Sequence, residues 1–185
     1  MDHDIRSEVL KEATLQFEKK GLKFTIQDIA DQLHIAKKTI YHLFPSKEKL
    51  MIAMIEDGFE KIQEEKEKII QSSLPIDRKL RKVLIAFPKA YQHIDFGKLE
   101  GLEKYPDVAE CLNRNLEQNW EPILSMMTEG IREGIFRKVD LTVFRLMITA
   151  SFEKFLSSDG LKKAGIQYQT GLEHMVDIVM GGIEK

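Results

Sequence analysis

The sequence predicts an all-α fold, with an N-terminal three-helix head over residues 1–46 and a larger helical body over residues 47–185. No segment of useful length alternates between apolar and polar residues, as a half-buried strand does. Apolar residues instead recur at three- and four-residue steps along most of the chain, as on one face of a helix. Between residues 25 and 50, two short amphipathic segments lead directly into a third, which predicts a helix-turn-helix joined to a fourth helix.

Composition limits the class of protein further. A chain of 185 residues with 43% hydrophobic residues can bury a continuous core, and its single cysteine, Cys111, excludes an intrachain disulfide. No apolar run approaches the roughly 18 to 20 residues that cross a bilayer. The first residues lack a basic segment followed by an apolar stretch, so we expect a cytoplasmic protein.

The charge is local rather than global. A net charge of -2 argues against a protein that coats a polyanion with its whole surface. Residues 33–50 nevertheless carry four lysines against one acid, Glu48. This pattern predicts one small basic face that meets phosphates on an otherwise nearly neutral protein.

The head is predicted element by element. A first helix over residues 4–20 has one apolar face, and Gly21 ends it. Thr25, followed three residues later by Asp28, predicts a capping box at the start of a helix over residues 26–33. His34 takes the turn, where a positive φ is expected, and a further helix follows over residues 36–44.

These residues resemble a known family. Thr25 with Ile29-Ala30, then His34-Ile35-Ala36-Lys37-Lys38-Thr39-Ile40-Tyr41, then Phe44-Pro45-Ser46-Lys47-Glu48 with Leu50 are similar to the N-terminal signature of the TetR family of bacterial transcriptional regulators. The likeness covers about the first 50 residues. The chain departs from it at His34, where the family most often has glycine, at Ala36, where it has serine, and at Lys38, where a small residue is common.

The spacing of these residues predicts how the head reads DNA. The outward face of the helix over residues 36–44 would enter the major groove, and a two-fold dimer would match a palindromic operator. We expect Lys37, Lys38 and Thr39 to face base edges or flanking phosphates, and Tyr41 and His42 to reach the backbone and one base step. Lys47 and Thr25 are expected at phosphates. Taken singly, each could be an ordinary exposed residue; the set at these offsets favours DNA binding.

The body is predicted as a series of longer helices. We expect them over residues 47–71, 76–94 with a bend at Pro88, 106–133 with a kink at Pro122, 141–158 and 168–183. The helix over 141–158 is so apolar that something beyond its own domain should cover one side, and the helix over 168–183 has one clean apolar stripe. The family resemblance implies that they form a dimer interface built as a four-helix bundle. The predicted interface residues are Phe144, Ile148, Phe155, Leu172, Met175, Val176 and Val179.

An effector pocket is predicted among aromatic and sulphur-containing residues of the body. Such residues suit an apolar or aromatic small molecule, although each one taken alone is better explained as an ordinary core residue. The candidates are Phe59, Phe87, Tyr91, Phe96, Tyr105, Trp120, Met127, Met147 and Phe152.

Other kinds of chemistry are not favoured by the sequence. Cys111 could act as a redox trigger, but a lone cysteine on an apolar helix face is usually a packing residue. His93, Asp95 and His174 lack the close spacing of metal ligands, and no arrangement of catalytic residues or phosphate loop stands out. We therefore expect no metal, no cofactor and no enzymatic activity.

Together these observations predict a homodimeric, sequence-specific DNA-binding transcriptional regulator. It would act as a repressor that a small effector releases from its operator by preferring the non-binding state. The alternative is an all-helical ligand-carrying or protein-interaction module whose helix-turn-helix no longer reads DNA. Ala36 and the weak overall charge keep that alternative open.

Overall fold

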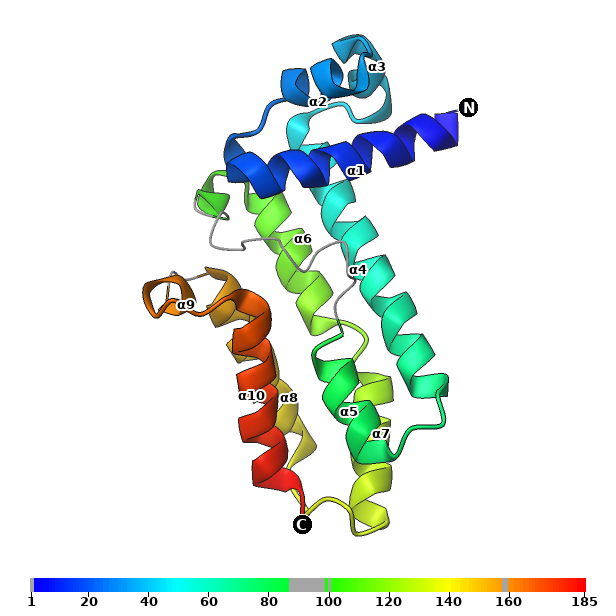
Figure 1. The fold of residues 1–185 in the computed structure, drawn as a ribbon, viewed down its shortest axis with the longest axis vertical. Helices are drawn as coiled ribbons and strands as arrows, with labels where there is room; N and C mark the ends of the chain where they lie inside the picture. The colour runs from blue at the N-terminus through cyan, green and yellow to red at the C-terminus, as the bar shows by residue number, and fades with distance from the viewer. Residues whose placement is uncertain (1, 87–98, 100, 158–159) are drawn as a thin grey trace. The chain divides into compact units, whose positions relative to one another are not determined.

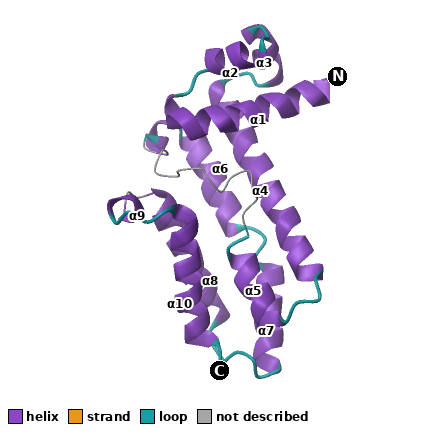
Figure 2. Cartoon of the chain, in the orientation of Figure 1, coloured by secondary structure: helices purple, strands orange, loops and turns teal. Residues whose placement is uncertain are grey.

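The computed structural model describes residues 2–86, 99, 101–157 and 160–185, and within them every regular element is a helix apart from one isolated bridge between Phe136 and Glu184 (Figures 1 and 2). The all-α prediction is confirmed. Contacts group the chain into two compact units, Met1–Glu60 with His93–Asn115, and Lys61–Gln92 with Leu116–Lys185. Within the described residues, no helix combines the length and the apolar character that crossing a bilayer requires.

The first unit begins with the predicted head. Its elements are α1 (Asp2–Lys20), the 3-10 turn η1 (Gly21–Lys23), α2 (Ile26–Leu33), α3 (Lys37–Leu43) and the first part of α4 (Lys47–Gln71). The bounds of the four α-helices each lie within two residues of the predicted ones, and the 3-10 turn was not predicted. Local signals therefore determine the head: apolar spacing defines each helix, and capping or turn residues end it.

The core of the first unit collects the apolar faces of those helices. Its fully buried members include Val9 of α1, Phe24 before α2, Ile29 of α2 and Ile40 of α3. Val108 of α6 (Pro106–Glu117) belongs to the same cluster, although it lies far along the chain. The head is thus packed against a segment that the sequence assigned to the body.

The second unit contains the end of α4, α5 (Ile76–Leu84), α7 (Glu121–Arg132), α8 (Leu141–Ser157), α9 (Gly160–Lys163) and α10 (Tyr168–Ile183). Its core includes Leu80, Met127, Phe136, Ile148 and Met180, each at most 1% exposed. The helix over 168–183 has the predicted bounds, and the helix predicted to Ser158 is described to Ser157.

Two predicted helices were too long. The helix predicted over residues 76–94 ends at Leu84, with Ile85 as its C-cap, and the predicted bend at Pro88 lies outside the described residues. The helix predicted over 106–133 is two helices, α6 and α7, separated by Asn119 with φ 61°. Pro122 lies in the first turn of α7, where proline is tolerated, and not at a kink.

The C-terminus is fastened to the second unit. The guanidinium of Arg81 on α5 donates to both carboxylate oxygens of Glu184, at 3.1 and 2.9 Å, and to Asp177 Oδ1 at 2.8 Å. The Arg137 amide donates to the Ile183 carbonyl at 2.8 Å. These bonds join α5, the segment before α8 and the end of α10.

Candidate nucleic-acid interface

The start of α2 is held by the predicted capping box. Thr25 Oγ1 accepts a hydrogen bond from the Asp28 amide at 3.2 Å, and Asp28 Oδ2 accepts one from the Thr25 amide at 2.8 Å. Lys20 Nζ lies 2.7 Å from Asp28 Oδ1. The hydrogen bond from Lys20, followed by that from the Thr25 amide, lowers the pKa of Asp28 to about 2. The Thr25 hydroxyl is thereby fixed at the start of the helix.

The turn between α2 and α3 is a left-handed cap at His34. Its φ of 54° and ψ of 39° confirm the positive φ predicted there. The Ile35 amide donates to the Ala30 carbonyl at 3.0 Å, which satisfies an acceptor at the end of α2. Histidine therefore occupies a conformation that favours glycine, and the hydrogen bonds of the turn are kept.

The helix α3 presents two distinct faces. Ile40 is fully buried and Phe44, at its C-cap, is 3% exposed, so both anchor the helix to the core. The outward side carries Lys37, Lys38 and His42, all exposed, and Tyr41, which is 46% exposed. Thr39 is half-buried between the two faces. The structure thus brings five of the seven predicted DNA-contacting residues onto one short helix.

The beginning of α3 has no side-chain cap. Ala36 is its N-cap residue and offers no oxygen, and only the Thr39 amide is bonded locally, to the Ala36 carbonyl at 2.9 Å. This is the expected consequence of alanine at a position where serine would accept a hydrogen bond.

Lys47 lies in a setting that the sequence did not indicate. Its Nζ donates to the Leu22 carbonyl at 2.5 Å and lies 4.6 Å from the centre of the Phe24 ring and 5.7 Å from that of Tyr105. Burial lowers the pKa of this ammonium. The side chain already has partners within the unit, so a phosphate contact would require it to leave them.

Arg6 is a cation beside the end of α3 that the sequence pattern did not single out. It is exposed on α1, and its guanidinium lies 5.1 Å from the centre of the Phe44 ring. It therefore contacts the end of α3 directly. Nothing in the spacing of α1 signals this contact, because the residues involved are 38 positions apart.

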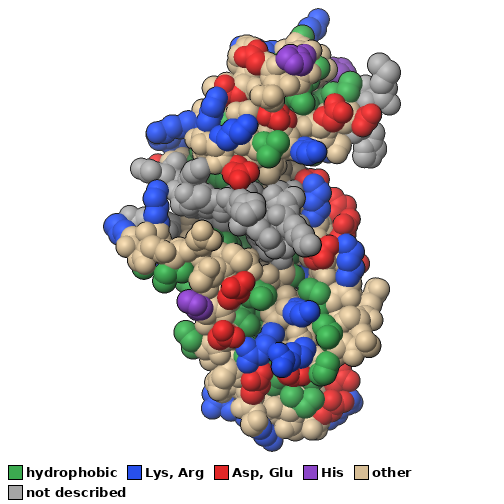
Figure 3. Space-filling view, viewed as in Figure 1, with side chains coloured by type: hydrophobic (Ala, Val, Ile, Leu, Met, Phe, Trp, Pro, Cys, Tyr) green, Lys and Arg blue, Asp and Glu red, His purple; other side chains and the backbone are tan. Residues whose placement is uncertain are grey.

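The charges of the wider surface are mixed. Figure 3 shows acidic and basic side chains interspersed over the visible face of the molecule, in keeping with the net charge of -2. A uniform attraction for polyanions is not supported by such a surface. On this face, attraction for a polyanion would depend on local groups and not on the net charge.

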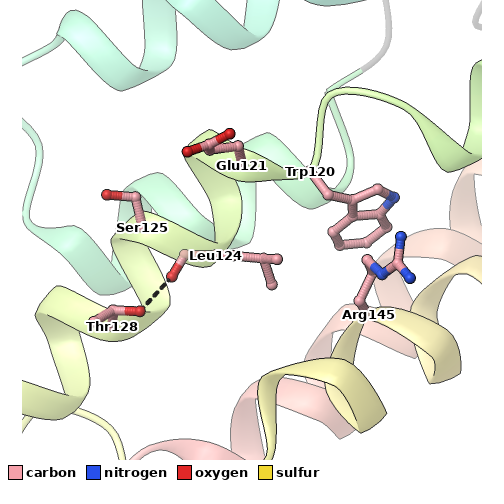
Figure 4. A pocket seen from close by; sticks show the side chains of 6 residues that line it. All are labelled: Trp120, Glu121, Leu124, Ser125, Thr128 and Arg145. Atoms are coloured by element: carbon pink, nitrogen blue, oxygen red, sulfur yellow. Dashed lines mark hydrogen bonds between the residues drawn. The ribbon is translucent and has the colours of Figure 1, made fainter.

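The described members of the predicted effector set are divided between the two units. Phe87, Tyr91 and Phe96 lie outside the described residues. Phe59 and Tyr105 belong to the first unit, while Trp120, Met127, Met147 and Phe152 belong to the second. Of the latter, Met127 is fully buried and Met147 is 59% exposed. A hollow of about 370 Å³ in the second unit includes only Trp120 from the predicted set (Figure 4).

The predicted dimer residues lie inward. Phe144, Ile148, Leu172, Met175 and Val176 are each at most 8% exposed and belong to the core of the second unit. Phe155 and Val179 are half-buried against the same core. The apolar residues that α8 and α10 leave exposed are Val143, Leu146, Met147 and Ile178, at 52% to 77%. A partner subunit can therefore reach these four more readily than the predicted seven.

Cys111 and the histidines complete the predicted sites. Cys111 is buried, and burial raises the pKa of its thiol, which opposes formation of the reactive thiolate. His93 and Asp95 lie outside the described residues. Within the described part of the chain, no group of three or more histidine, cysteine, aspartate or glutamate side chains could hold a metal ion.

Comparison with known proteins links this geometry to a family. Residues 9–54 match the family model for bacterial regulatory proteins of the tetR family. The chain is 27% identical over 179 residues to the uncharacterized HTH-type transcriptional regulator YvaF of Bacillus subtilis. The aligned region covers 95% of this chain and 93% of the relative. The chain is 28% identical to the HTH-type transcriptional repressor KstR2 of Mycolicibacterium smegmatis, over 96% of this chain and 90% of the relative.

Solved structures share the fold over nearly the whole chain. A putative transcriptional regulator from Saccharomonospora viridis in complex with choline superposes with a TM-score of 0.78 at 17% identity, covering 99% of both chains. The regulator FadR from Bacillus subtilis in complex with stearoyl-CoA gives a TM-score of 0.68 at 18% identity, covering 96% of this chain and 99% of the other. At these identities the likeness concerns the fold.

Proposed function

The chain belongs to the tetR family of bacterial regulatory proteins, and from this premise we propose that it is a homodimeric, sequence-specific DNA-binding repressor released by a small effector. We assign DNA binding to residues 1–46 and the effector and dimer functions to residues 47–185. The observation that carries the proposal is the outward face of α3, where Lys37, Lys38, Tyr41 and His42 are exposed while Ile40 and Phe44 hold the helix in the core.

The roles on DNA follow from that face. Lys37, Lys38 and Thr39 meet base edges or the phosphates that flank them, and Tyr41 and His42 meet the backbone and a neighbouring base step. Thr25, fixed by its capping box, reaches a phosphate from the start of α2. Lys47 contributes to phosphate binding only when its ammonium leaves the Leu22 carbonyl. Arg6 joins the set because it lies beside Phe44 at the end of α3.

Dimerisation supplies the second head that a palindromic operator requires. We place the interface on the exposed apolar residues of α8 and α10, Val143, Leu146, Met147 and Ile178, in place of the inward residues that the sequence suggested. Large side chains of this kind are costly to leave in water, so a second copy of the same face is the natural cover. A symmetric pairing uses the same patch twice.

Release by an effector is proposed by analogy with the related proteins. KstR2 of Mycolicibacterium smegmatis is named a repressor, and neighbouring folds are described in complex with stearoyl-CoA and with choline. An effector acts here by binding the non-DNA-binding arrangement more tightly, and operator occupancy falls by that difference in affinity. An apolar or aromatic molecule fits the residues of the body best.

The test of DNA reading is a gel shift with the full chain and the DNA upstream of its own gene, followed by selection from random sites. A sequence-specific shift that weakens steeply with salt is expected. Replacing Lys37 and Lys38 together by glutamine should reduce the slope of log affinity against log salt by about 2. The matched control replaces Lys162 and Lys163 of α9, an adjacent pair outside the head, and should leave binding unchanged.

Two results would count against the proposal. One is the absence of any sequence-specific shift in both experiments, which would favour a ligand-carrying or protein-interaction module. The other is equal loss of binding in both lysine pairs, because it would mean that only net charge matters and that α3 reads nothing.

A further inference from the structure

The second unit contains a hollow that the proposed DNA contacts and dimer face do not use. It has a volume of about 370 Å³ and is lined by Trp120, Glu121, Leu124, Ser125 and Thr128 of the α7 region and by Arg145 of α8. Small-molecule sites range from about 300 to 1,000 Å³, so the hollow has room for a small ligand. Glu121, Ser125 and Thr128 are exposed, so the site is open to solvent.

The floor of the hollow is apolar and fixed. Trp120 is 7% exposed, and its indole Nε1 donates to the Leu116 carbonyl at 3.2 Å, which holds the ring in one orientation. Leu124 packs against the core of the unit and is half-buried. Thr128 Oγ1 donates to the Leu124 carbonyl at 2.8 Å, so this hydroxyl is directed to the backbone. A flat ring or a branched alkyl group could lie against Trp120 and Leu124 without displacing either.

Arg145 gives the hollow one positive charge. Arg145 is half-buried as a residue, and among the described residues no ion pair or hydrogen bond engages its guanidinium. Figure 4 shows Arg145 beside the indole of Trp120, with Leu124 directed to the same side, while the Glu121 carboxylate points away from the guanidinium. A guanidinium presents parallel N–H groups in a fork that matches the two oxygens of a carboxylate.

We propose that this hollow binds a small organic carboxylate, with the carboxylate on Arg145 and the apolar group against Trp120 and Leu124. The charge count favours a monoanion: the site offers a single unpaired cation, and Glu121 at its rim would oppose the second charge of a phosphate. Binding at this site does not depend on DNA. Only the use of such a carboxylate as the effector rests on the proposed function.

The chain provides its own probe, because Trp120 is its only tryptophan. Titration of the full-length protein with 3-phenylpropanoate should give a saturable change in Trp120 emission. The neutral 3-phenylpropanamide, which has the same shape, should bind at least about tenfold more weakly, because it cannot form the charge-assisted pair with Arg145. Arg145→Gln should remove this discrimination, and Arg145→Lys should keep part of it.

Arg132→Gln is the matched control, because Arg132 is an exposed arginine of α7 that does not line the hollow. It should bind both compounds as the native protein does. Equal affinity for the acid and the amide would overturn the proposal, as would an unchanged preference in Arg145→Gln. So would the absence of both an emission change and a heat of binding up to about 10 mM ligand.

Adding 3-phenylpropanoate to the gel shift tests the carboxylate site and the proposed DNA-binding function separately. Binding by fluorescence with no effect on the DNA complex would leave the carboxylate site standing and refute its role as an effector. Absence of any DNA complex would refute the proposed function, while the fluorescence titration would still decide the site.

Discussion

The segment from Thr25 to Leu50 and the helix pair α8 and α10 differ in what fixes the direction of their side chains. In the segment, each short helix has one apolar and one polar face, and α2 begins at its Thr25 cap and ends at its His34 cap. Residues within four positions therefore determine which side chains point inward. In α8, apolar residues occur nearly all round the helix, and α10 adds the exposed Ile178 outside its buried apolar stripe. Which of them face inward is then decided by contacts with distant helices, and local spacing does not contain that information.

The largest effect should come from the core of the second unit. Phe136 is fully buried against Gly130, where an added Cβ would lie 2.3 Å from the Phe136 ring. Phe136→Ala should lower the free energy of unfolding by about 3 to 5 kcal/mol, because the cavity cannot be filled by neighbours this tightly packed. Chemical denaturation measures it. Tyr41→Ala, at an exposed aromatic of the head, should change stability by less than about 0.5 kcal/mol; similar losses in both would contradict the contrast.

The exposed side of α10 is the next test of the comparison. Ile178→Glu places a charge on a large apolar residue that is 77% exposed, and it should weaken the dimer at least about tenfold in sedimentation equilibrium, because an unpaired carboxylate would be buried at the interface. Leu15→Glu, on α1 and 39% exposed, should leave the dimer intact. If Ile178→Glu has no effect, the interface lies elsewhere.

The capping box of the head should give a smaller, pH-dependent effect. Lys20 and Thr25 hold the folded-state pKa of Asp28 at about 2, below its ordinary value of 3.8. The contribution of the carboxylate is therefore fully present above about pH 4 and is lost as the pH falls toward 2. Asp28→Asn should cost at most about 1 kcal/mol at pH 7, since the group is near solvent, and this difference should vanish near pH 2. If the difference in the free energy of unfolding between the native protein and Asp28→Asn does not change with pH, the charge of the Asp28 carboxylate is not its cause.

The smallest effect is expected at the left-handed turn. His34→Gly relieves a positive φ and should raise the free energy of unfolding by some tenths up to about 1 kcal/mol, partly offset by the freer unfolded chain. Asn119→Gly makes the same change at φ 61°, between α6 and α7. Similar increases in the free energy of unfolding at both sites would show that the backbone conformation alone causes the increase in the head and in the body. A loss at His34 would mean that its side chain stabilises the turn.

The outcomes along the chain follow one rule. The Thr25 cap, the His34 turn and the bounds of α2, α3 and α10 could be predicted, because each depends on residues a few positions apart. The break at Asn119 could not, because a single proline at position 122 is compatible with a kink or with a new helix start. The chain takes the latter because Asn119 adopts a left-handed conformation, which the sequence permits and does not require.

Contacts between distant residues escaped prediction for a related reason. Lys47 follows the pattern of an exposed residue in the first turn of a helix, yet its ammonium lies at the Leu22 carbonyl, 25 residues earlier, and near Tyr105. Arg6 meets Phe44 from another helix. The hollow at Trp120 and Arg145 joins two helices in the same way. The periodic spacing of apolar residues along the sequence does not indicate any of these pairs.

By itself, the sequence determined the all-α class, the helix-turn-helix and the residues that its third helix turns outward, because apolar spacing and caps act over one or two turns. The tertiary structure decided which faces of α8 and α10 remain exposed, and which side chains meet around Lys47 and Arg145. Those features depend on the free energy of packing one helix against another, and that energy is set by partners far away in the chain.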